Sequence, residues 1–309
     1  MPRKVSRFTL AGIFAVAALY LLGFSGDRYL LTILTFCAIY AVYATTLNFT
    51  AGYVGQVNLG HAIFFGTGGY ITAYLNTKIG LPLPVTILSS TILSMVAGLI
   101  LGFLTLRTKG PFLLLVTALS NIVLINLVYS LSQFTGGEDG LTGVTKITTD
   151  PILNYYILTT YTLLTTTVLV ILLRGRLGYG FKLIREDEDL AASMGVNVVM
   201  HKLLAFAASS TLTGLAGALY AHYVGVVGPG ALSFDLTFHA LVMILLGGWG
   251  TLPGPLIGAY IVTLFNEYLR ALGLYRTLIL GLATLLVILR FRKGIYGALQ
   301  ERIKLSFRA

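Results

Sequence analysis

Long apolar segments follow one another through almost this whole chain, with only short polar stretches between them. A helix of about twenty apolar residues crosses the hydrocarbon core of a bilayer and satisfies its own backbone hydrogen bonds there. Only 10% of the residues are charged, whereas a soluble domain carries about 25%. The sequence therefore predicts an all-α integral membrane protein.

We expect about ten transmembrane helices in a single membrane domain covering residues 1–309. The expected segments are roughly 8–24, 29–50, 54–76, 83–106, 111–131, 153–173, 204–224, 234–249, 254–270 and 275–291. The third, eighth and ninth are rich in glycine, and we expect some of them to be short or broken helices. The first resembles a signal peptide, but no small-residue cleavage site follows it, so we interpret it as a retained helix.

The basic residues predict the orientation of these spans. Sixteen of the 21 Lys and Arg fall in four polar segments. These segments are the N-terminal tail 1–7, the loop near 108, a long loop at about 174–203, and the C-terminal end with its tail 292–309. Ten spans place all four on one side, and basic loops mark the cytoplasmic side. We therefore expect both termini in the cytoplasm, the loop 133–151 outside, and no nucleic-acid partner despite the net charge of +10.

One segment combines dense glycine with polar side chains inside an apolar stretch. Six glycines lie between Gly52 and Gly69, and Gln56, Asn58 and His61 lie among them. Small residues let helices approach closely in a bilayer. Polar side chains at that depth face a bundle interior or a water-filled path. These residues therefore either line a path or only bind neighbouring helices together.

A second glycine-rich segment, Leu246 to Tyr260, contains two prolines. Proline disfavours a regular helix, so Pro253 and Pro255 predict a tight cytoplasmic turn or re-entrant backbone here. We expect Gly254 and Gly258 to form a helix-packing face. No Lys-Ser/Thr pair follows the glycines, so the segment is not a phosphate-binding loop.

Two loops complete the candidate features. In the cytoplasmic loop, the charge run Arg185 to Asp189 precedes a helix-forming stretch, Leu190 to Met194, which Gly195 and Asn197 can end. We expect a short helix that docks on a partner, with a passive solvated loop as the alternative. The external stretch Thr135 to Gly143 is dense in glycine and carries two carboxylates. A flexible turn is the default there, since the calcium-loop spacing is absent.

No arrangement of residues typical of catalysis is present. The chain has no Ser/His/Asp set, no HExxH and no ATP-binding motif. Cys37 is the only cysteine, and no second ligand stands three or four residues from His61, so we expect no metal site. The sequence therefore predicts that the chain is not an enzyme and holds no cofactor.

Five segments, in order along the chain, resemble the membrane permease subunits of branched-chain amino acid ABC transporters of the high-affinity leucine/isoleucine/valine type. They are G-x-x-G-Q-x-N-L-G-H-A-x-F-F-G-x-G-x-Y (Gly52 to Tyr70), T-G-G-x-D-G-L-x-G (Thr135 to Gly143), I-R-E-D-E-x-x-A-A-x-x-G-V-N-V (Ile184 to Val198), K-L-L-A-F-x-x-S-x-x-x-x-G-L-A-G-A-L-Y-A (Lys202 to Ala221) and L-G-G-x-G-T-L-x-G-P-x-x-G-A-Y (Leu246 to Tyr260). Asn58 departs from the serine usual in the family, and Glu138 stands at a variable position.

The resemblance implies a pore in the plasma (inner) membrane made with a second homologous permease subunit. Two cytoplasmic ATPase subunits would bind the ATP, and an extracytoplasmic substrate-binding protein would deliver the solute. The residues expected along the substrate path are Asn48, Gln56, Asn58, His61, Phe65, Thr135, Gly136 and Gly137. The residues expected to couple to the ATPase are Arg185, Glu186, Asp187, Ala191, Ala192 and Gly195.

Three alternatives remain open. Relatives within the same family carry urea or short amides. An ion-coupled secondary transporter would place carboxylates in mid-span, whereas Asp235 and Glu267 lie near predicted span ends. A membrane-embedded enzyme would need a catalytic set.

Overall fold

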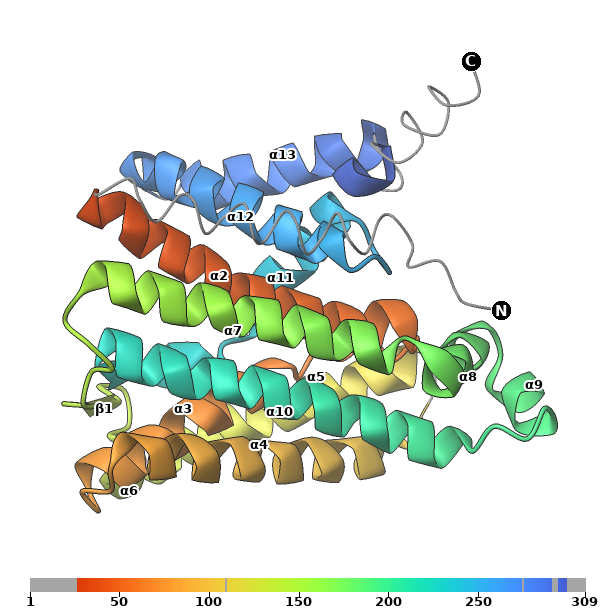
Figure 1. Ribbon diagram of the computed structural model, residues 1–309, viewed down its shortest axis with the longest axis horizontal. Helices are drawn as coiled ribbons and strands as arrows, with labels where there is room; N and C mark the ends of the chain where they lie inside the picture. The colour runs from red at the N-terminus through yellow and green to blue at the C-terminus, as the bar shows by residue number, and fades with distance from the viewer. Residues whose placement is uncertain (1–26, 109, 274, 291–293, 299–309) are drawn as a thin grey trace. The chain divides into compact units, whose positions relative to one another are not determined.

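The computed structural model describes residues 27–108, 110–273, 275–290 and 294–298. Nearly all of its regular structure is helical (Figure 1), which confirms the all-α class. The predicted segment 8–24, the tail 1–7 and most of the tail 292–309 lie outside the described residues.

The elements follow in chain order. The first half comprises α2 (Arg28–Asn48), η2 (Phe49–Tyr53), α3 (Ala62–Thr77), α4 (Leu83–Thr105), α5 (Pro111–Ser130), α6 (Ser132–Thr135), β1 (Leu141–Thr142) and α7 (Pro151–Leu172). The second half comprises α8 (Gly175–Glu186), α9 (Glu188–Ser193), α10 (Val198–Val224), β2 (Val226–Val227), η3 (Pro229–Leu232), α11 (Phe234–Gly247), α12 (Pro253–Tyr268), η4 (Leu269–Leu272) and α13 (Tyr275–Arg290).

Five of the described helices are long and apolar enough to cross a membrane. They are α2 with its continuation η2, α4, α5, α7 and α10. Each coincides with a segment expected from the sequence, although α10 begins at Val198 rather than near residue 204. A multi-pass membrane protein follows from these five alone.

The four remaining predicted segments that fall on described residues form shorter helices, α3, α11, α12 and α13. A 16-residue helix such as α3 rises about 24 Å, less than the roughly 30 Å of a bilayer core. Helices α3, α11 and α12 match the three glycine-rich segments, where short or broken helices were expected. The total of ten spans and the cytoplasmic position of both termini stay predictions.

The chain divides into two compact units. Unit 1 contains α2, most of α7, α12 and α13. Within it α12 packs on α2 (Figure 1), and the Thr162 hydroxyl of α7 donates to the Ala38 carbonyl of α2 at 3.1 Å. Unit 2 contains α3 to α6 and α8 to α10, and α3, α4 and α10 pack against one another in it.

Helix α4 has its polar residues inside and its apolar residues outside. Its small and polar residues recur every four positions and are buried: Thr86, Ser90, Ser94 and Gly98. This spacing aligns them on one helix face. The outward face carries large apolar side chains such as Phe103, which is 69% exposed. Such a pattern suits lipid outside and close helix packing inside.

Glycines make the contact between α3 and α10 close. A Cβ at Gly68 would overlap the carbonyl oxygen of Gly214, and a Cβ at Gly217 would overlap the carbonyl oxygen of Phe65. The apolar core beside this contact consists of Ile63, Phe64, Leu101 and Phe206. Only residues without a side chain allow the two backbones to meet in this way.

The second glycine-rich segment differs in part from expectation. Pro253 and Pro255 do not prevent a helix, because they lie in the first turn of α12. There the missing N–H would have no partner in the helix, so proline is tolerated. The tight turn precedes them, at residues 248–252. The packing role of Gly254 and Gly258 is confirmed, since added Cβ atoms would collide with Gly247 to Gly248 and with the Met243 carbonyl.

Candidate functional site

The backbone between α2 and α3 is not a regular helix. After Asn48 it forms the π-helical turn η2, and residues 54–61 are non-helical before α3 begins at Ala62. We call residues 49–61 the junction segment. π-turns often mark functional positions, and irregular backbone at membrane depth is tolerated only where protein or a water-filled cavity surrounds it.

The middle of the junction segment is hydrogen-bonded to α5. The Asn58 Oδ1 accepts the Gly60 N–H at 2.8 Å, and the Thr117 Oγ1 accepts the Leu59 N–H at 3.1 Å. A Cβ at Gly60 would overlap the Thr117 carbonyl oxygen. Asn58 is fully buried, and its Nδ2 finds no acceptor among the described residues. A buried amide with unused donors is costly unless something else binds it.

The end of the junction segment is held by α10. The Nε2 of His61 lies 3.0 Å from the Thr213 Oγ1, and that hydroxyl donates to the Ser209 carbonyl at 2.7 Å. Because the hydroxyl proton is used there, its lone pair faces the ring, which assigns the proton of His61 to Nε2. One helical turn later, Phe65 packs against Tyr220 with ring centroids 5.3 Å apart. Both His61 and Phe65 are buried.

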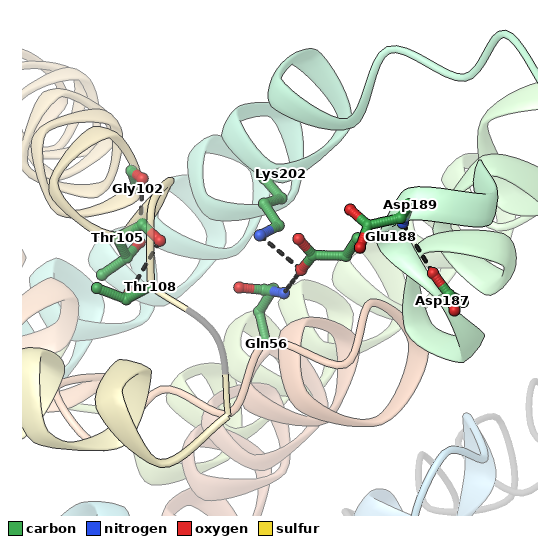
Figure 2. Close-up of polar contacts among 8 residues, drawn as sticks. All are labelled: Gln56, Gly102, Thr105, Thr108, Asp187, Glu188, Asp189 and Lys202. Atoms are coloured by element: carbon green, nitrogen blue, oxygen red, sulfur yellow. Dashed lines mark hydrogen bonds and ion pairs between the residues drawn. The ribbon is translucent and has the colours of Figure 1, made fainter. Parts of the chain in front are cut away.

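Gln56 does not extend toward Asn58 and His61 but toward α9, in the loop predicted to be cytoplasmic. Its Nε2 donates to Glu188 Oε1 of α9 at 3.1 Å, and the same oxygen lies 2.6 Å from the Nζ of Lys202 in α10 (Figure 2). Beside it, Arg185 Nη1 donates to the Gly52 carbonyl at 2.6 Å. The junction segment thus contacts α8 and α9 at its beginning, and α5 and α10 further along.

Asn48 belongs to unit 1, where it holds the turn before α12. Its Oδ1 accepts the Gly250 N–H at 2.9 Å, and its Nδ2 donates to the Thr251 carbonyl at 2.7 Å. Both ends of the buried amide are therefore used by the backbone. This geometry gives Asn48 a structural role, while its place on a substrate path stays a prediction.

The glycine-rich stretch Thr135 to Gly143, which is predicted to be external, is folded rather than a free turn. Gly136, Gly137 and Gly140 have positive φ angles, and the Thr135 hydroxyl accepts the Gly137 N–H at 3.2 Å. Leu141–Thr142 pairs in antiparallel register with Val226–Val227, directly after α10. Thr135, Gly136 and Gly137 thus lie on a separate structural feature from the junction segment.

The residues expected to couple to the ATPase form a compact helical knob. Asp187 ends α8 and caps α9 by accepting the Asp189 and Leu190 N–H groups at 2.8 and 3.0 Å. Gly195 ends α9 with a φ of +81°. Ala191 packs inward, whereas Glu186 and Ala192 are exposed. Leu190 and Met194 expose 51% and 63% of their surface. A docking surface for a partner at these side chains stays a prediction.

Sequence reasoning missed the partners of these residues. Thr117, Glu188, Lys202 and Thr213 were not singled out for such roles. Asn197 was expected to end α9, but it caps the start of α10 by accepting the Met200 N–H at 3.0 Å. An asparagine just before an apolar run is the signal that would have identified this cap.

These features define a multi-pass helical membrane protein with a structured knob formed by α8 and α9, and comparison with known proteins identifies its class. Residues 29–289 match the family model described as branched-chain amino acid transport system / permease component. The chain belongs to this family of ABC-type transport permeases, and it is a protein of the cytoplasmic (inner) membrane and not an enzyme.

Individual relatives cover most of the chain. The high-affinity branched-chain amino acid transport system permease protein LivM of Escherichia coli strain K12 is 28% identical over 92% of this chain and 73% of its own length. LivM of Salmonella typhimurium strain LT2 is 28% identical, over 89% and 71%. The autoinducer 2 import system permease protein LsrC of Salmonella paratyphi B is 29% identical, over 73% and 67%. No solved structure matches the chain.

Proposed function

We propose that this chain is the permease subunit of an ABC importer that moves branched-chain or related small amino acids into the cytoplasm. The observation that carries the proposal is the knob formed by α8 and α9. It offers an exposed apolar edge, Leu190 and Met194, and it contacts the junction segment through Arg185 and Glu188. The family and the names of the LivM relatives support the solute class.

The proposed assembly contains a second homologous permease subunit, two cytoplasmic ATPase subunits and an extracytoplasmic substrate-binding protein. ATP binds to the ATPase subunits, and this chain holds no cofactor. Opening of the path to one side at a time would follow the alternating-access scheme of membrane transporters. This division of labour makes the chain inert by itself.

The carboxylates favour this scheme over an ion-coupled secondary transporter. Among the described residues, Asp235 and Glu267 are the only carboxylates on helices expected to span the membrane, and they lie at the ends of α11 and α12. Glu267 accepts hydrogen bonds from the Tyr29 hydroxyl at 2.7 Å and from Arg270 at 3.0 Å. A proton or sodium relay needs carboxylates deeper in the membrane.

The docking role of the knob is tested by measuring the affinity of the chain for the ATPase. Replacing Glu186 by Lys and Leu190 by Ser changes only exposed side chains of α8 and α9. We expect association with the cognate ATPase, measured by co-purification and titration, to weaken about tenfold. The control Asp139→Lys alters an exposed carboxylate of the loop predicted outside and leaves association intact. Equal affinity in all three proteins contradicts the docking role.

The proposed role of Asn58 in the substrate path is tested by substitution. A serine hydroxyl is able to keep the turn by accepting the Gly60 N–H, but it removes the buried Nδ2. We expect Asn58→Ser to change the relative uptake of a panel of amino acids while expression and thermal stability stay close to wild type. Unchanged preference with lowered stability would make Asn58 a purely structural residue.

The solute itself is best identified through the binding protein. The LsrC relative favours a second candidate, a small polar solute that is not an amino acid, and urea or a short amide is a further alternative. We expect branched-chain amino acids to raise the melting temperature of the cognate binding protein most. Stabilisation by autoinducer 2 or by urea alone would overturn the proposed solute class and leave the ABC scheme standing.

A further inference from the structure

Side chains from three separate segments of unit 2 meet at one carboxylate oxygen, that of the partly buried Glu188. Glu188 Oε1, in the first turn of α9, accepts from Gln56 of the junction segment and pairs with Lys202 of α10 (Figure 2). Lys202 is 2% exposed and Gln56 is 4% exposed. We call this set the Glu188 link.

Stability alone does not explain such a link. Removing two charges from water costs about as much as their attraction returns, so a buried ion pair adds little to folding. The ion pair does fix the position of α9 relative to α10, because moving Glu188 away leaves the buried Lys202 charge uncompensated. If α9 moves, therefore, either the junction segment moves with it or the buried Lys202 ammonium loses its counter-charge.

A second contact makes the attachment rigid. Arg185, at the end of α8, binds the Gly52 carbonyl, and the Arg185 backbone lies against Gly55, where an added Cβ would stand 3.2 Å from its Cα. Only Asp187 separates α8 from α9, and it caps α9. The knob thus holds the junction segment on both sides of Gly55, at Gly52 and at Gln56.

The link also has unused hydrogen-bonding capacity. Gln56 Oε1 is buried and accepts no hydrogen bond from the described residues. The Lys202 ammonium carries three donors; it forms an ion pair with the Glu188 oxygen but makes no hydrogen bond among the described residues. A second arrangement, in which Lys202 donates to Gln56 Oε1 while Glu188 moves off, is open to the same side chains. Coupling between sites needs an element of this kind with two discrete arrangements.

We propose that the Glu188 link transmits displacement of α9 to the junction segment, with Gln56 as the residue that follows and Lys202 as the fixed anchor on α10. This inference rests on the proposed function, because it takes α9 to be the helix that the ATPase moves. All three are positioning residues: they act on Asn58 and His61 through the backbone of residues 56–61.

The test uses the complete transporter in proteoliposomes, with uptake and ATP hydrolysis measured on the same vesicles. Gln56→Met keeps the length of the side chain, removes its hydrogen bond to Glu188 and leaves the Glu188–Lys202 pair in place. We expect ATPase binding and hydrolysis to persist while uptake per ATP falls at least about five-fold, the lower end of ordinary coupling between sites. Parallel loss of uptake and hydrolysis, or an unchanged ratio, overturns the link.

A charge exchange and a matched control separate transmission from folding. The single reversals Glu188→Lys and Lys202→Glu should each lower uptake per ATP, and the combined exchange should restore most of it. Failure of the exchange to restore the ratio counts against the link. Thr105→Val is the matched control, since this buried hydroxyl bonds only within α4, to the Leu101 and Gly102 carbonyls (Figure 2). It should leave the ratio unchanged, and an equal fall there would make the effect a general one of packing.

Failure of the proposed function gives a different result. If the wild-type assembly takes up no solute in response to ATP, the proposed function is wrong and the link falls with it. If the wild type transports and Gln56→Met transports with the same ratio, the link alone is overturned.

Discussion

Gly55 stands between the two contacts through which the knob holds the junction segment. Its φ of +78° lies in the left-handed region, and Arg185 occupies the space where a side chain would begin. Gly55→Ala therefore meets both backbone strain, about 1–2 kcal/mol, and a tight contact, because the added Cβ would lie 3.2 Å from the Arg185 Cα. We expect a clear fall in the thermal midpoint measured in detergent.

Gly143 provides the control for that substitution. Its φ of +83° is similar, but no atom lies within 4 Å of an added Cβ. Gly143→Ala should show the strain alone, so the difference between the two midpoints measures the Arg185 contact. Equal losses would show that the knob does not press on Gly55.

At the residue scale, the sequence identified the important polar side chains but not the residues that they contact. Gln56 and Asn58 were recognised as polar groups in an apolar stretch. The partner of Gln56, however, lies 132 positions away, and no local pattern encodes such a pairing. Lys202 was counted among the basic residues of the loop, yet it lies buried in α10. A charge within a cluster does not reveal whether the fold will neutralise it.

Among the helices, the contact between α3 and α10 depends most on glycine. In Gly68→Ala the new methyl group would overlap the Gly214 backbone, so the two helices must separate. Overpacking of this kind costs about 1–3 kcal/mol. We expect an SDS-induced unfolding titration to show that loss.

Gly281→Ala in α13 is the matched helical control. No atom lies within 4 Å of its added Cβ, and alanine favours the helix by up to about 1 kcal/mol over glycine. The control should be neutral or stabilising. If both variants unfold alike, close packing of α3 on α10 is not what these glycines provide.

Element boundaries followed from the sequence wherever one simple signal dominated. Hydropathy placed α4, α5 and α7 to within a few residues, because lipid contact alone decides such spans. The prolines of α12 were misinterpreted as breakers, although their positions in a first turn are compatible with a helix. The paired strands β1 and β2 had no sequence signal, since two residues each are too few for a pattern.

For the whole molecule, the charge pattern predicts that residues 139 and 186 lie on opposite sides of the membrane. Cys37 is the single cysteine of the sequence. A Cys37→Ala background therefore leaves only introduced thiols to react. We expect an impermeant maleimide added outside intact cells to label Asp139→Cys, and Glu186→Cys only after permeabilisation. Labelling of both from the same side would contradict the predicted topology.

The central claim is that this chain transports only as part of an ATP-driven assembly. The most direct measurement is solute uptake into proteoliposomes that contain the chain and its partner permease, with and without the ATPase, the binding protein and ATP. We predict uptake of branched-chain amino acids only when all components and ATP are present. Sustained uptake without ATPase subunits and without ATP, driven by an ion gradient alone, would contradict the claim.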